Sequence, residues 1–159
     1  MGFFFGLNED LIKSHLSADA TEVQNTIYQD NQVAMKAVLT KSWTYMPRAH
    51  LHAGGMGTTA VALILVLCVF GASRVVTTLI SLALGEGGLG YSIFWMWAGL
   101  RSPALEGTGA AEESLEWLAV PSSGGFVAAT IAVFVAVVAW MLAARRHEDG
   151  LEAASCKTD

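Results

Sequence analysis

The hydrophobic residues of this chain are gathered in three long runs separated by polar stretches. Between residues 49 and 100 the only formally charged side chains are Arg74 and Glu86, and residues 119–144 contain none. A helix needs about 20 apolar residues to cross a hydrocarbon core about 30 Å thick. The pattern therefore predicts an all-α integral membrane protein with three transmembrane helices. The predicted spans cover residues 47–73, 75–100 and 124–144.

Polar stretches flank and separate these runs. Residues 1–46 are predicted to form an amphipathic helical segment outside the hydrocarbon, with Asn8 as an N-cap ahead of two acidic residues. Pro47 then favours the start of the first span, because proline is accepted in the first turn of a helix. A short interfacial helix is expected over 108–120, and the tail 147–159 is expected to be mobile.

An alternative arrangement breaks the second run at GEGG, residues 85–88, and gives four shorter elements. Each half of that run is too short to cross a hydrocarbon core alone. We therefore favour a membrane domain of three spans over residues 47–146.

Composition agrees with this class of protein. The 159 residues are 53% hydrophobic and 14% charged, whereas about a quarter of the residues are charged in an average soluble domain. The net charge is −5 without a basic patch, so no nucleic-acid partner is expected. The sequence contains no nucleophile–base arrangement and no phosphate loop, which argues against an enzyme that works alone. The expected partners are the lipid bilayer and other membrane subunits or further copies of the chain.

The positively charged residues leave the orientation nearly balanced, although they normally gather on the cytoplasmic side. The side that holds the N-terminus has Lys41, Arg48 and Arg101. The opposite side has Arg74, Arg145 and Arg146. We favour a bacterial inner membrane, with the N-terminus on the external or periplasmic side and the C-terminus in the cytoplasm.

Glu86 lies near the middle of the second span. Ionisable residues at that depth are rare, and they mark ion sites, proton relays or ligand partners. One alternative is a protonated carboxyl that is hydrogen-bonded to a Ser, a Thr or a backbone carbonyl of a neighbouring helix. Another is a local break in the span, with Glu86 lining a water-filled cavity. The surrounding GEGGLG, residues 85–90, has the spelling of a dinucleotide loop, but such a loop follows a strand in a soluble βαβ unit. We interpret its glycines as a kink or a close contact between helices.

Small residues gather at the start of the first span. Ala53 and Gly57 are four positions apart, and Gly54 lies beside them. Residues at this spacing share one face of a helix. Small side chains let two helix backbones approach closely, so this face is predicted to pack against another helix.

Two histidines, His50 and His52, lie at the headgroup end of the first span. In a helix they differ by about 200° around the axis, so at most one of them points into the bundle. A hairpin that turns near residue 74 brings them level with Trp95 and Trp97, on either side of Met96. Imidazole and thioether groups are ligands of haem iron and Cu(I). The alternative is that histidine and tryptophan simply favour the interface.

The stretch RAHLHAGGMG, residues 48–57, resembles the start of the haem-binding helix in haem–copper-oxidase-like membrane proteins. The nitric-oxide-response haem–copper family, with its R-A-H-x-H start, is similar. The resemblance covers ten of the 159 residues. It implies haem b or copper as a cofactor and His50 or His52 as an axial ligand. The second ligand would come from Met96, from another protomer or from a partner subunit.

This chain departs from those families in two respects. They have many more spans, and they carry further histidines in later helices. Here the remaining histidines, His15 and His147, lie outside the predicted spans. A complete oxidase-type site with a copper centre is therefore not expected in this chain alone.

Three functions follow from these features. The first is a small subunit of a larger redox or energy-converting membrane complex, with a haem or metal site near His50 and His52. The second is a purely structural or assembly subunit without a cofactor. The third is a small ion or proton transporter that uses Glu86.

Overall fold

The computed structural model describes residues 8–105 and 107–155, and in this part of the chain all regular elements are helical. Three of these helices, α3, α4 and α6, are long and apolar enough to cross a membrane. The prediction of an all-helical fold with three candidate spans is confirmed. The elements are α2 (Glu9–Glu22), α3 (Gln32–Val69), α4 (Arg74–Arg101), the 3-10 helix η1 (Ser102–Ala104), α5 (Thr108–Glu113) and α6 (Glu116–Ser155).

Helices α3 and α4 form a hairpin with a tight turn. Gly71 has a φ of 67°, a left-handed conformation that favours glycine. Its N–H donates to the Cys68 carbonyl at 3.2 Å, and the Ala72 N–H donates to the Leu67 carbonyl at 3.1 Å. These two bonds form a Schellman motif, which satisfies carbonyls left free at the end of α3. Ser73 then caps the start of α4 with its side-chain oxygen.

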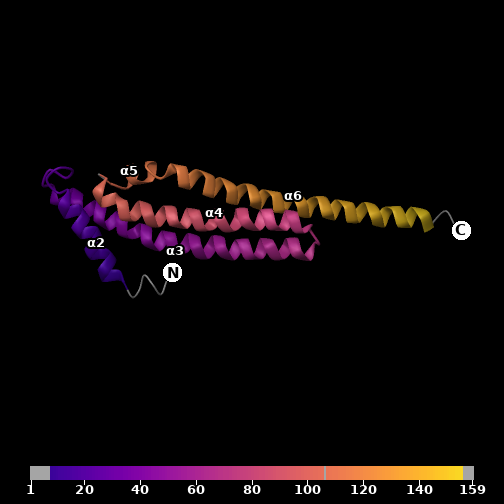
Figure 1. Cartoon of the computed structure of the whole chain (residues 1–159). Helices are drawn as coiled ribbons and strands as arrows, with labels where there is room; N and C mark the ends of the chain where they lie inside the picture. Colours follow the sequence, from indigo (N-terminus) through magenta and orange to yellow (C-terminus); the bar gives the residue numbers. More distant parts are fainter. Residues whose placement is uncertain (1–7, 106, 156–159) are drawn as a thin grey trace.

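Helix α4 lies between α3 and α6, and glycines make both contacts close (Figure 1). A Cβ atom on Gly88 would lie 3.3 Å from Cβ of Met56 on α3. One on Gly87 would lie 2.7 Å from the backbone oxygen of Ser122 on α6, and one on Gly90 would clash with the Ser122 hydroxyl. The segment GEGGLG is therefore helical, and its glycines serve the close helix contact that was one interpretation of the sequence.

Two prolines lie inside helices. Pro47, which was expected to start the first span, lies inside α3, and Pro121 lies inside α6. Each proline removes one backbone donor, yet the helix continues past it. The expected interfacial helix over 108–120 is correspondingly divided: α5 ends at Glu113, and residues 116–120 form the first turns of α6.

The N-terminal segment consists of α2, a turn over residues 23–31 and the first part of α3. Two non-glycine residues in this turn, Gln29 and Asp30, have positive φ angles of 47° and 62°. Helix α2 folds back along α3 (Figure 1). The Tyr28 hydroxyl donates to the Pro103 carbonyl at 2.7 Å, and burial raises the pKa of Tyr28 above its usual value. The turn is thereby joined to the end of α4.

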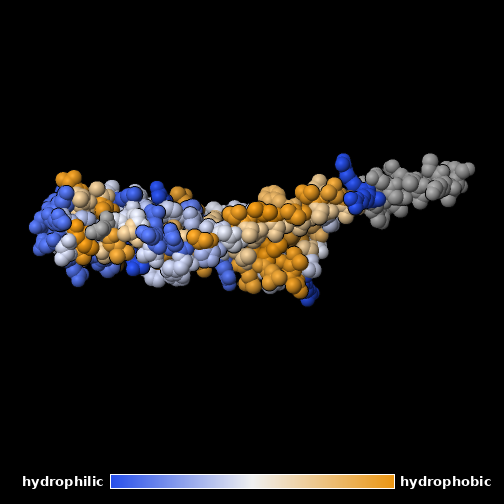
Figure 2. Space-filling model, turned by 90° about the horizontal axis from the view of Figure 1, so that it is seen from above, coloured by the Kyte–Doolittle hydropathy of each residue, from blue (hydrophilic) through white to orange (hydrophobic). Residues whose placement is uncertain are grey.

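The molecule is elongated, with a polar end and an apolar part. Figure 2 shows many hydrophilic residues toward the end that carries α2 and α5, and a hydrophobic surface near the turn of the hairpin and over the part of α6 that lies beside it. Helix α6 passes the hairpin turn, where the rings of Phe70 and Trp140 lie 4.7 Å apart, and continues to Ser155. The helix thus extends into the tail 147–159, and the mobility expected for that tail stays a prediction.

Candidate functional site

His52 lies in the contact between α3 and α4. Its ring stacks on that of Trp95, with centroids 5.8 Å apart and an interplanar angle of 11°. The ring of Tyr91 meets it edge-on, at a centroid distance of 4.9 Å. The expected depth match between His52 and Trp95 is confirmed by this contact.

His50 and Met96 do not join this cluster in the part of the chain that the structure describes. His50 is exposed on α3. Met96 follows Trp95 by about 100° around α4, which turns it away from α3. The chain alone thus offers one imidazole at this place, and no group of three or more His, Cys, Asp or Glu residues among those described could hold a metal ion. The ligand roles of His50, His52 and Met96, with haem b or copper as cofactor, stay predictions.

A polar network surrounds the His52 cluster. The Arg48 guanidinium lies 5.1 Å from the ring centroid of Trp95 and 5.2 Å from that of Tyr45. Both distances are within the range of a cation–π contact, about 6 Å. The buried Tyr45 hydroxyl donates to the Glu112 carboxylate on α5. The network therefore joins α3, α4 and α5, and sequence reasoning missed it because no local pattern links Tyr45 to Glu112.

Trp95 carries the one unsatisfied buried polar side-chain atom found in the described residues. Its Nε1 is buried and has no hydrogen-bond partner there. A buried donor without an acceptor costs about 1–3 kcal/mol.

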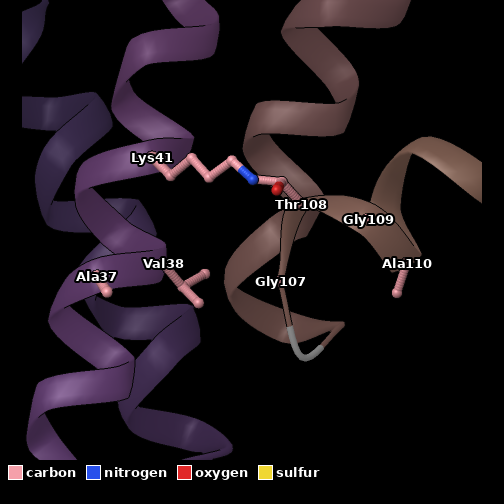
Figure 3. Close-up of a pocket in the computed structure, with 7 residues that line it drawn as sticks. All are labelled: Ala37, Val38, Lys41, Gly107, Thr108, Gly109 and Ala110. Atoms are coloured by element: carbon pink, nitrogen blue, oxygen red, sulfur yellow. The ribbon is translucent and has the colours of Figure 1, made fainter.

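A hollow of about 500 Å³ lies between α3 and the start of α5. Figure 3 shows the Lys41 side chain extending across it toward Thr108. Gly107 has a φ of 134°, which lets the chain turn sharply into α5. Among the described residues that line the hollow, Lys41 carries the one ionisable side chain. Its lining consists of Ala37, Val38, Lys41, Gly107, Thr108, Gly109 and Ala110.

Glu86 lies on the side of α4 that faces neither α3 nor α6. It is exposed, and within the described residues it makes no hydrogen bond and no ion pair. The alternative of a carboxyl bonded to a neighbouring helix of the same chain is therefore not found there. Leu82, Gly85 and Leu89 are exposed on the same stripe, at helical spacing. These four residues form what we call the outer face of α4.

The small residues at the start of the first span line a shallow groove that we call the α3 groove. A Cβ atom on Gly54 or Gly57 would meet nothing within 4 Å, so neither glycine is needed for packing inside this chain. Helix α4 instead packs on another side of α3, through Met56 and Ala60. The predicted packing face is thus left uncovered by the described chain. The groove is lined by Ala53, Gly54, Gly57, Thr58, Val61, Ala62 and Leu65.

No protein-family model matches this chain, and no curated protein or solved structure matches it. The resemblance of residues 48–57 to haem-binding helices therefore rests on those ten residues alone.

Proposed function

We propose that this chain crosses a membrane three times and functions as a subunit of a larger membrane assembly. The observation that carries the proposal is the position of Glu86, exposed at the middle of the second candidate span without a partner in the described part of the chain. A charged side chain at the bilayer centre costs about 2.5–3.5 kcal/mol even on the mildest scales. A neighbouring protein that covers Glu86 and offers it a polar group removes most of that cost.

The α3 groove supports the same proposal. Glycine lowers helix stability by about 0.8–1 kcal/mol relative to alanine. Gly54 and Gly57 gain no close contact within the chain that offsets this cost. A helix from another subunit would gain a close backbone approach at these positions.

The proposed assembly lies in a bacterial inner membrane, with α2 and α5 on the periplasmic side. Arg145 and Arg146 end the apolar part of α6 and would then lie on the cytoplasmic side, where positive residues gather. A proton or ion pathway at Glu86 is compatible with this arrangement. A single acidic residue on one span forms such a pathway only when other subunits surround it, so a pathway at Glu86 would also require the assembly.

Photo-crosslinking in native membranes tests the proposal. A benzophenone amino acid is placed at Leu82 on the outer face of α4, and at Phe134, an exposed residue of α6, as the matched control. We expect protein adducts from Leu82 that are several-fold more abundant than those from Phe134. Glu86→Leu should reduce the Leu82 adducts, because it removes the exposed carboxyl group that favours a protein partner over lipid. Adducts with lipid alone at Leu82 would contradict the proposal.

A further inference from the structure

We infer that the partner covering Glu86 is a second copy of this chain, whose α3 groove receives the outer face of α4. The inference rests on the proposed function, since it names the partner at the same face.

The two surfaces differ in the size of their side chains. The α3 groove has a volume of about 510 Å³, and the side chains on its floor are as small as glycine. The outer face of α4 presents Leu82 and Leu89, which are 54% and 57% exposed, on either side of Glu86. Gly85 lies between the leucines, and a Cβ there would meet nothing within 4 Å. Large side chains thus project from one surface where small ones leave room on the other.

The polar groups on these two surfaces lie at the same depth. Met56 of α3 faces Gly88 of α4. The two helices run in opposite directions. Thr58 is two residues after Met56 on α3, and Glu86 is two residues before Gly88 on α4, so Thr58 and Glu86 lie at the same level. Two copies inserted in the same direction share one depth in the membrane. The Glu86 carboxyl of one copy therefore meets the level of Thr58 in the next.

The chemistry of Thr58 suits a carboxyl partner. Its hydroxyl donates to the Gly54 carbonyl of its own helix at 2.8 Å. The hydroxyl oxygen keeps lone pairs that accept a hydrogen bond. When the Glu86 carboxyl carries a proton, it donates to this oxygen, which removes the need to hold a charge in hydrocarbon and leaves neither group unpaired. Thr58 and Val61 also place a polar and an apolar contact side by side along the groove.

The contact joins different surfaces of the two copies, so it is heterologous. A dimer then keeps one free α3 groove on one copy and one free outer face of α4 on the other, and further copies add until the ring closes. A symmetric contact of α4 with α4 would also cover Glu86. It would leave the α3 groove open and would bring two carboxyl groups together, so the structure favours the heterologous contact.

Disulfide trapping in native membranes distinguishes these arrangements. Cys68 and Cys156 are first replaced by serine, and Ala62→Cys and Leu82→Cys are introduced together, because these positions lie at one depth on the two surfaces. After oxidation we expect a ladder of dimers, trimers and larger species built from the 16.9 kDa chain. Each single-cysteine variant should stay monomeric. Pairing Leu82→Cys with Phe134→Cys on α6 is the matched control and should give no ladder.

Two milder substitutions test the polar contact without changing the shape of the groove. Thr58→Val removes the acceptor oxygen and should lower the yield of the ladder about threefold, the effect of an average hydrogen bond between membrane helices. Thr58→Ser keeps the hydroxyl and should retain the yield. Equal yields from both variants would overturn the role of Thr58.

The remaining outcomes separate this inference from the proposed function. A dimer from Leu82→Cys alone would show a symmetric contact and overturn the heterologous one. No ladder, together with photo-adducts at Leu82 that contain only other proteins, would overturn self-association and leave the proposed function intact. Absence of any protein adduct at Leu82 would overturn both.

Discussion

His50 and His52 carry the same imidazole side chain but lie in different environments. His52 is half-buried against two aromatic rings of α4, whereas His50 is exposed on α3. Their different environments follow from helix geometry, because two positions along a helix correspond to about 200° of rotation around its axis. Any ligand held inside the bundle can therefore use His52 but not His50.

This difference predicts unequal effects of two alanine substitutions. His52→Ala should lower the free energy of unfolding by about 1–2 kcal/mol, since it removes ring contacts with Trp95 and Tyr91. His50→Ala should change it by less than about 0.5 kcal/mol. Chemical unfolding in detergent, followed by circular dichroism, measures both values. Equal losses would contradict the placement of the two rings.

The same two variants test the predicted ligand roles. If the assembly binds haem through this chain, the Soret absorption of the purified assembly should fall in His52→Ala and persist in His50→Ala. A Soret band that survives both substitutions would remove the haem hypothesis for this pair, and a wild-type assembly without a Soret band would remove haem as the cofactor.

One contact of the candidate site could be predicted from the sequence, and another could not. The hairpin places His52 level with Trp95 because both helices rise by about 1.5 Å per residue from one turn. The contact between Tyr45 and Glu112 depends on where α5 lies, and the loop before α5 decides that position. No periodicity in the sequence contains this information.

Among the helices, α4 is the one whose packing depends most on glycines. Gly87, Gly88 and Gly90 let α3 and α6 approach it from two sides. In a membrane, helices associate through close packing rather than through the hydrophobic effect. The contact between α4 and α6 is therefore sensitive to a single added methyl group.

We predict that Gly87→Ala destabilises the protein by about 1–3 kcal/mol, because the new Cβ meets backbone atoms of Ser122 and Phe126 that cannot move independently. Gly124→Ala is the matched control: a Cβ there meets nothing within 4 Å, and alanine favours the helix by up to about 1 kcal/mol. Thermal unfolding in detergent compares the two variants. A Gly87→Ala protein as stable as Gly124→Ala would contradict the close contact.

The spans themselves follow from hydrophobic runs, whereas their ends do not. By local rules Pro47 and Pro121 mark helix boundaries, yet both helices continue through them. Helix α6 also continues through Ser122 and Gly124, although both residues have a weak helix propensity. The local boundary signals therefore do not decide where these two helices begin.

For the whole molecule, three crossings predict that the two ends of the chain lie on opposite sides of the membrane. In a background without Cys68, a cysteine introduced at the exposed Thr40 and the native Cys156 are labelled separately with an impermeant maleimide. Thr40→Cys should react in intact spheroplasts, and Cys156 only after the membrane is opened. Reaction of both from one side would contradict three crossings, and the reverse order would invert the proposed orientation.

The apolar part of α6 reaches further than the hairpin beside it. Trp140 lies level with Phe70 at the hairpin turn, and Arg145 follows five residues later, which is about 7.5 Å along a helix. The apolar run of α6 is therefore shifted along the helix axis relative to the hairpin rather than lengthened, because residues 124–144 are fewer than residues 75–100. One bilayer cannot be centred on both runs, and a run that overshoots the hydrocarbon is accommodated by tilting or by a local change in bilayer thickness, at a modest cost for each ångström. The tilt of the protein should therefore increase as the lipid chains become shorter.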